Sequence, residues 1–294
     1  MSRLIHSKRS GLHSEAEVLD WAHRSLGPLD VIDDVSSPHS TQRVLHCETR
    51  SNDAVIVKWF VDSPCFFNSL DTLTNYSVAL GGSAPRLIDQ NETLRALVMT
   101  HVPGHSANKD QSLDPTIHFT LGTLLRQFHD SAPTNRSTEI AAQLASTLST
   151  HIDSAEALIG ETLASEARQL AMQLLDLESI SLMPTHGAIS PEHILIDPDR
   201  GVHLIGFSRS EYNPWILDTA ILERNLWTYS PELRSAFFTG YDKEPDSSDL
   251  LVLRAIQLID ACKEWLEVSA RRVSKSELAR STQQIESALG GTLF

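Results

Sequence analysis

The chain has 294 residues, of which 41% are hydrophobic and 21% are charged. That length allows one large domain or two lobes with a core each, and neither proportion indicates disorder. No apolar run approaches the roughly 20 residues that a membrane-spanning helix needs. The basic N-terminal segment, residues 1–15, lacks the apolar centre of a secretory signal. We therefore expect a cytoplasmic protein with no membrane partner.

The formal net charge of −14 argues against broad binding of nucleic acid, which requires a basic face. Three cysteines, Cys47, Cys65 and Cys262, lie far apart in the sequence and form no Cys-x-x-Cys pair. This pattern fits a reducing compartment, and it predicts neither a disulfide framework nor a zinc site.

Local patterns in the first hundred residues predict a small sheet that carries helices. Ser14 and Glu17 have the spacing of a capping box at the start of an amphipathic helix. Gly81-Gly82 ends a second helical segment, and apolar stretches separated by turn residues predict strands. The expected elements are helices over 14–26 and 66–80 and strands over 43–49, 54–60, 84–89 and 94–100.

After Pro103-Gly104 the pattern becomes helical. Asp114 can cap a helix that Pro115 opens, and a further helical stretch runs from about 138 to 178. A short hairpin interrupts the helices between 185 and 208. A late helix places five apolar residues on one stripe, which we assign to the core: Leu251, Ala255, Leu258, Cys262 and Trp265.

These patterns predict an α+β protein with a boundary near residue 102. Residues 1–102 form a strand-rich N-terminal lobe and residues 103–294 form a larger helical C-terminal lobe.

The order of these elements resembles the aminoglycoside phosphotransferase family, small-molecule kinases with the bilobal protein-kinase-like fold. The similar segments are AVIVKWF (54–60), LVMTHVPG (97–104), LGTLLRQFH (121–129), THGAISPEHILID (185–197), VHLIGFS (202–208) and WILDTA (215–220). The resemblance implies that Lys58 holds nucleotide phosphates and that Thr100, His101 and Val102 line the cleft against adenine. It also implies that Asp218 holds the catalytic loop in place.

Phosphoryl transfer needs a positioned nucleotide, magnesium on the phosphate oxygens and a carboxylate that orients the attacking hydroxyl. In this family's loop an aspartate is the base, an asparagine binds metal, and a second aspartate in the hairpin binds magnesium. The resemblance puts Ala188, His193 and Gly206 at these three positions. A methyl group accepts no proton, glycine offers no side-chain ligand, and histidine is a poor magnesium ligand. We therefore expect none of the family's catalytic residues to be intact.

Two further departures concern the nucleotide side of the site. The segment that matches the glycine-rich loop, residues 36–44, contains no glycine, and Pro38 removes a backbone donor. Ser69 stands at the position of the glutamate that would pair with Lys58. Asp71 is two residues further on and points away by about 200° around the helix.

Several of these residues also have an ordinary structural interpretation. Lys58 can be a solvated lysine at the end of a strand, and His186 is expected to bond to the backbone. His193 lies beside Glu192, but neighbouring residues do not face the same way and no third ligand follows at a recognisable spacing. We therefore expect no metal site.

The sequence thus predicts a pseudokinase-like protein that acts as a binding, regulatory or substrate-presenting partner of another enzyme. It requires no cofactor, its nucleotide binding is weak at most, and its interlobe cleft takes a protein, peptide or small-molecule ligand. The alternative is an active phosphotransferase on a small-molecule hydroxyl or a peptide Ser/Thr. It would use Glu192, Asp197 or His193 together with Lys58. A purely structural protein is the third interpretation.

Overall fold

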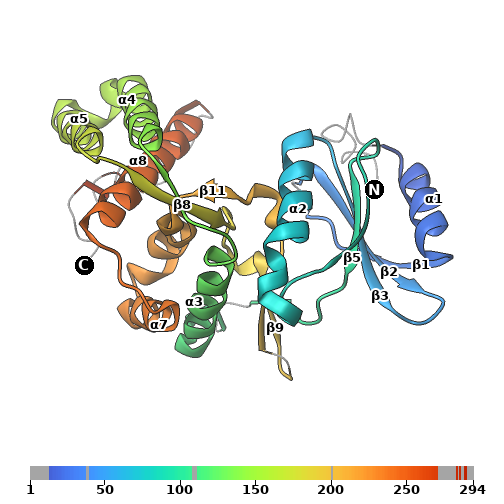
Figure 1. Ribbon diagram of the computed structural model, residues 1–294. Coiled ribbons are helices and arrows are strands. Elements are labelled where there is room, and N and C mark those ends of the chain that lie inside the picture. The colour runs from blue at the N-terminus through green and yellow to red at the C-terminus, as the bar shows by residue number, and fades with distance from the viewer. Residues whose placement is uncertain are drawn as a thin grey trace. The chain divides into compact units, whose positions relative to one another are not determined.

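The computed structural model describes residues 13–37, 40–107, 111–199 and 201–270, and the single positions 283, 285, 288 and 289. The contacts divide the chain into two compact units (Figure 1). Unit 1 contains the described residues up to Ser112 together with His186–Glu211, and unit 2 contains Leu113–Thr185 and the described residues from Tyr212 onward. Unit 1 therefore extends past residue 102 and also takes in the segment that matches the catalytic loop and hairpin.

Unit 1 is built on a five-stranded antiparallel sheet in the order β1-β2-β3-β5-β4. The four strands predicted from the sequence are confirmed within a few residues, whereas β1, with three aspartates in LDVIDD, has little strand propensity and was missed. The strands are β1 (Leu29–Asp34), β2 (Gln42–Thr49), β3 (Ala54–Phe60), β4 (Leu87–Asn91) and β5 (Ala96–Thr100).

Helix α1 (Glu15–Leu26) covers one face of this sheet (Figure 1). Its predicted capping box is present: the Ser14 hydroxyl accepts the Glu17 N–H, and the Glu17 carboxylate accepts the Ser14 N–H. The helix buries Val18 and Trp21 against strand residues that alternate along β3, including Val57 and Trp59, so one face of the sheet is an apolar core.

Helix α2 (Ser63–Asn75) packs on the opposite face, where Phe66 meets Phe60 edge-on with 5.9 Å between ring centroids. It begins three residues before the predicted start, because the Asp62 carboxylate caps the Cys65 N–H and Pro64 lies in the first turn. The predicted helical segment ends early as well, and a 3-10 segment, η1 (Ser77–Ser83), follows.

The hairpin predicted within residues 185–208 is confirmed and lies in unit 1. Strands β9 (Ile194–Asp197) and β10 (Gly201–Leu204) pair antiparallel, and β6 (His105–Ser106) adds to β9. Short 3-10 turns, η3 (Pro191–His193) and η4 (Phe207–Arg209), flank the hairpin.

Unit 2 is mainly helical, as predicted. Asp114 accepts the Thr116 N–H and Pro115 opens α3, which confirms the predicted start of that helix. The stretch predicted as one helix from 138 to 178 is two helices, because Gly160 has a φ of +85° that breaks the α-helix. The helices are α3 (Pro115–His129), α4 (Glu139–Ile159), α5 (Glu161–Leu175), α6 (Ala220–Leu222), α7 (Pro231–Tyr241) and α8 (Ser247–Ala270).

Smaller elements precede, follow or connect these helices. They are strands β7 (Asn135–Ser137), β8 (Ile180–Thr185) and β11 (Glu211–Asn213), the 3-10 turns η2 (Gln111–Leu113) and η5 (Trp215–Thr219), and the π-helix η6 (Glu223–Trp227). Two of them, η2 and β11, span the sequence boundary between the units. Helices α3 and α7 come close enough that an added Cβ on Gly240 would lie 2.8 Å from the Phe119 carbonyl carbon and closer still to its oxygen. Among the described helices, none is both long and apolar enough to cross a membrane.

Candidate functional site

The segment that matches the catalytic loop is held by its own backbone and by two histidines. His186 is fully buried, and its Nε2 donates to the Ile205 carbonyl at 2.8 Å. Gly187 has a φ of +74°, and an added Cβ there would collide with the Arg209 carbonyl. The loop therefore packs directly on η4, and only glycine fits at this contact.

His193 lies where a side chain at position 206 would lie. Its Nδ1 donates to the Ala188 carbonyl at 2.6 Å, which fixes the ring, and the Ser190 hydroxyl is 3.1 Å from the same nitrogen. Gly206 has a φ of +89°, and an added Cβ would stand 2.8 Å from His193 Nε2 and closer still to Cδ2. The imidazole and any larger residue at 206 exclude one another in this arrangement.

These residues do not fit a magnesium ion. Ala188 and Gly206 offer no side-chain donor, and the Nδ1–H of His193 is already bonded. Burial lowers the pKa of His193, so its ring is neutral. The atom left to bind a metal is the Nε2 nitrogen, whereas magnesium prefers oxygen ligands. In the part of the chain that the structure describes, no group of three or more His, Cys, Asp or Glu residues could hold a metal.

Lys58 projects from β3 on the face that α2 covers, with its Nζ 4.9 Å from the centroid of the Phe60 ring. No carboxylate of the described residues forms an ion pair with it, and burial lowers its pKa to about 8. Ser69, at the position of the expected glutamate, is buried, and its hydroxyl has no hydrogen-bond partner among the described residues. Asp71 is exposed and accepts from Asn75, as its predicted direction requires.

The three residues predicted to face adenine follow one another at the end of β5. The Thr100 hydroxyl accepts the Arg86 N–H at 2.9 Å, and Val102 is buried. His101 stacks on His46 of β2, with 4.4 Å between ring centroids and 15° between ring planes. Burial and the charge of His46 both lower the pKa of His101.

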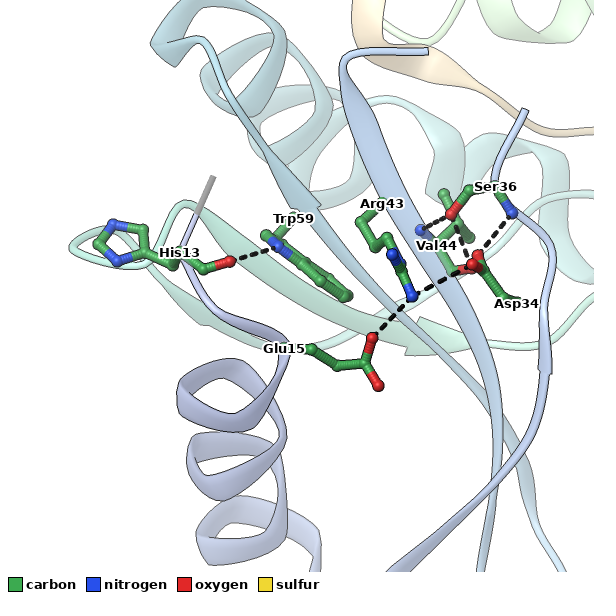
Figure 2. A network of polar contacts seen from close by, with 7 residues as sticks. All are labelled: His13, Glu15, Asp34, Ser36, Arg43, Val44 and Trp59. Carbon is green, nitrogen blue, oxygen red and sulfur yellow. Dashed lines mark hydrogen bonds and ion pairs between the residues drawn. The ribbon is translucent and has the colours of Figure 1, made fainter. Parts of the chain in front are cut away.

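Residues 36–44, which follow β1 and include the start of β2, correspond to the glycine-rich loop, and several N–H groups of the described residues here and of Val35 bond within the hairpin. Val35 donates to the Val44 carbonyl. Ser36 donates to the Asp34 carboxylate, and Val44 donates to the Ser36 hydroxyl at 2.8 Å (Figure 2). Pro38, which was expected to remove a phosphate donor, lies outside the described residues. These three N–H groups are therefore committed to the hairpin itself.

Arg43 fastens this hairpin to α1. Its guanidinium pairs with Glu15 at 2.7 Å and with Asp34 at 3.2 Å, and it lies 5.9 Å from the Trp59 ring (Figure 2). The Trp59 indole donates to the His13 carbonyl at 3.1 Å. This network anchors the start of β2, where the loop that would cover the phosphates ends.

Asp218 lies in unit 2, in a buried chain of three polar side chains. His129 Nε2 donates to the Asp218 carboxylate at 2.9 Å, and the Tyr241 hydroxyl donates to His129 Nδ1 at 2.7 Å. All three side chains are at most 2% exposed. This chain of hydrogen bonds fixes Asp218 within unit 2.

The structure thus brings together His186, Ala188, His193 and Gly206, with Lys58 near enough for its charge to lower the pKa of His193. Three neighbours were not found from the sequence: His46, Cys65 and Arg209. The antiparallel register could have revealed His46. It pairs with Ile56, two positions before Lys58 on β3, so the His46 and Lys58 side chains lie on the same face of the sheet. No comparable signal marks Cys65 or Arg209.

The model of the phosphotransferase enzyme family matches residues 50–253. A comparison with curated proteins gives no match. Among solved structures, the macrolide 2'-phosphotransferase of Brachybacterium faecium is similar with 12% identity and a TM-score of 0.62, over 95% of this chain and 99% of that chain. An aminoglycoside phosphotransferase from Alicyclobacillus acidocaldarius is 15% identical with a TM-score of 0.64, over 99% and 97% of the two chains.

A spectinomycin phosphotransferase, solved in complex with ADP and spectinomycin, is 12% identical with a TM-score of 0.57, over 95% of this chain and 98% of that chain. At these identities the solved structures establish the kinase-like fold alone, and the match over residues 50–253 establishes the family. The chain is a member of the phosphotransferase enzyme family.

Proposed function

We propose that this chain is a phosphotransferase-family protein that has lost phosphoryl transfer and acts as a cytoplasmic binding partner of another enzyme. It would regulate that enzyme or present a substrate to it by binding a protein, peptide or small-molecule ligand. It would require no magnesium. The observation that carries the proposal is the position of the His193 ring, which fills the space of a side chain at 206 while Ala188 supplies only a carbonyl to it.

Two independent features support this reading. Lys58 has no carboxylate partner among the described residues, and the loop that would cover the phosphates directs at least three of its N–H groups inward. A missing base alone typically costs about 10²–10⁴-fold in rate, and the missing metal ligands lower transition-state stabilisation further.

The test is a pair of measurements on the full chain. Thermal unfolding with ATP should be unchanged by added magnesium, and ADP should not rise above the rate in buffer with hydroxyl acceptors such as aminoglycosides, macrolides or Ser/Thr peptides. A large magnesium-dependent rise in Tm, or acceptor-dependent ADP release, would overturn the proposal.

The alternative of an active phosphotransferase rests on one retained feature, the amine of Lys58 on the expected face of β3. Glu192, Asp197 or His193 would then replace the missing groups. Acceptor-dependent ADP release that Lys58→Ala abolishes would favour this alternative over our proposal.

A further inference from the structure

Strand β1 forms an outer edge of the five-stranded sheet, where it pairs with β2 alone (Figure 1). Alternate N–H and C=O groups of an edge strand point away from its single neighbour and can pair with another strand. Among the described residues, no strand pairs with this outer side of β1. The sheet therefore ends on backbone donors and acceptors that a further strand could use.

The same edge exposes large apolar side chains. Val31 is 44% exposed, Ile32 is 54% exposed, and Val35, directly after the strand, is 49% exposed. Strand β4, at the other edge of the sheet, exposes one such side chain, Ile88. Exposed apolar side chains along an open strand edge favour pairing with another chain, and β1 is the edge where they gather.

A β-bulge between Val31 and Asp33 places two carboxylates on one face of this edge. Asp30 lies opposite Glu48, and Asp33 lies opposite His46. Glu48 and His46 are two positions apart on β2, so Asp30 and Asp33 point to the same side of the sheet. Without the extra residue of the bulge, the two aspartates would point to opposite sides.

The carboxylates on this face lack a counterion among the described residues. Asp30, Asp33 and Glu48 form no ion pair with any of them, whereas Asp34, on the other face, pairs with Arg43 at 3.2 Å. Like charges directly opposite one another on neighbouring strands destabilise the pairing, and Asp30 and Glu48 stand in that relation. A basic side chain placed beside them would relieve this repulsion.

We propose that the outer edge of β1 binds an extended segment of a partner protein in which basic and apolar side chains alternate, and that this segment adds a strand to the sheet. Its basic residues would lie beside Asp30 and Asp33. Its apolar residues would lie beside Val31, which the register places on the opposite face, and the exposed Ile32 adds to that contact. A second copy of this chain fits less well, because it would bring another acidic strand to the same edge in a chain of net charge −14.

Fluorescence anisotropy on the full chain tests the proposal with a labelled peptide of about eight residues in which valine and lysine alternate. We expect saturable binding at up to about 1 mM protein, and no binding of the peptide in which glutamate replaces lysine. N-methyl groups on two adjacent central residues remove N–H donors from both edges of the peptide. This version should bind at least about tenfold more weakly, because backbone pairing is lost.

Variants of the edge separate the effect of its charge from that of its apolar surface. Asp30→Asn/Asp33→Asn should weaken binding by about fivefold or more, and Ile32→Thr by about threefold or more. The matched control is Asp71→Asn/Glu92→Gln, which neutralises two exposed carboxylates of unit 1 that form no ion pair with described residues. It should change the affinity by less than about twofold. The double aspartate variant should unfold at the same or a higher urea concentration, because it removes a repulsion, so weaker binding cannot come from a damaged sheet.

No saturable binding, equal binding of the lysine and glutamate peptides, or full affinity in the double aspartate variant would overturn the proposal. Concentration-dependent dimerisation that Ile32→Thr abolishes would also overturn it, by assigning the edge to a second copy. Binding that appears only after Arg3, Lys8 and Arg9 are replaced by glutamine would overturn it in favour of the chain's own N-terminal residues.

This inference goes beyond the proposed function and does not depend on it, because no residue of the segment that matches the catalytic loop contributes to the surface. Absent peptide binding would therefore leave the proposed function standing. Magnesium-dependent phosphoryl transfer would overturn the proposed function and leave the β1 edge as a binding surface.

Discussion

Replacing Gly206 by aspartate, the residue that the resemblance to the family implies there, should destabilise this protein through two separable effects. The backbone at 206 has a φ of +89°, which costs a non-glycine residue about 1 kcal/mol. The new Cβ would also lie 2.8 Å from His193 Nε2 and closer to Cδ2. Relief of this clash requires the ring to leave its place.

Displacing the ring breaks the 2.6 Å hydrogen bond between His193 and the Ala188 carbonyl, which contributes about 1 kcal/mol. Lost packing of a half-buried imidazole adds a similar amount at most. Gly206→Asp should therefore cost about 2–3 kcal/mol in the native background. In His193→Ala the clash is absent, and the same change should cost about 1 kcal/mol, so the coupling between the two sites is about 1–2 kcal/mol.

Gly201 provides a matched control, because its φ is +91° and an added Cβ there meets nothing within 4 Å. Gly201→Asp should thus report the backbone effect alone. Equilibrium urea unfolding followed by circular dichroism gives the free energy of unfolding for all five proteins. Equal costs for Gly206→Asp and Gly201→Asp, or no relief in the His193→Ala background, would refute the idea that the imidazole occupies the place of the metal ligand.

Three further predictions concern other parts of the chain. Gly240→Ala should destabilise by about 2–3 kcal/mol, since its Cβ meets backbone atoms of α3, whereas Gly82→Ala, with open space around it, should change stability by less than about 1 kcal/mol in the same urea assay. Tyr241→Phe should cost about 1–3 kcal/mol by removing the donor to buried His129, and a cost near zero would argue against that bond. Lys58→Met should stabilise the protein at pH 7, where burial penalises the charged amine. Because the pKa of Lys58 is about 8 in the folded protein and higher when unfolded, this gain should shrink as the pH rises from 8 to about 10.5, and a constant gain would contradict the lowered pKa.

Local sequence signals predicted most elements of the fold, for identifiable reasons. The Ser14–Glu17 capping box and the Asp114-Pro115 start are set by contacts within one helical turn, so the sequence contains them in full. The stripe on α8 from Ala255 to Cys262 is buried as predicted, because helical period alone places these residues on one face.

The predictions of secondary structure were wrong where a single residue, or a contact between segments far apart in the sequence, determines the local structure. Gly160 splits the helical stretch because its backbone is left-handed, and a glycine in such a pattern is tolerated too often to predict a break. Strand β1 forms through pairing with β2 despite an acidic sequence.

The sequence predicted which residue types occupy the candidate site. How these residues contact one another depends on the tertiary structure. The sequence alone gives Ala188, His193 and Gly206 as three separate departures from the family pattern. Only the structure brings the His193 ring into the space above Gly206 and hydrogen-bonds it to the Ala188 carbonyl. The stacking of His101 on His46 likewise requires β2 and the end of β5 to be placed side by side.

Under the proposed loss of phosphoryl transfer, this contact also determines which substitutions could rebuild a magnesium site. An aspartate at 206 alone collides with the imidazole, and a smaller residue at 193 alone leaves a hole beside a left-handed glycine that still offers no ligand. An aspartate at 188 alone gains a carboxylate beside His193 but no second metal ligand. The three positions are therefore energetically linked, and a magnesium site can be rebuilt only by changing 193 and 206 together. If the proposed function holds, no single substitution at 188, 193 or 206 should therefore give magnesium-dependent phosphoryl transfer.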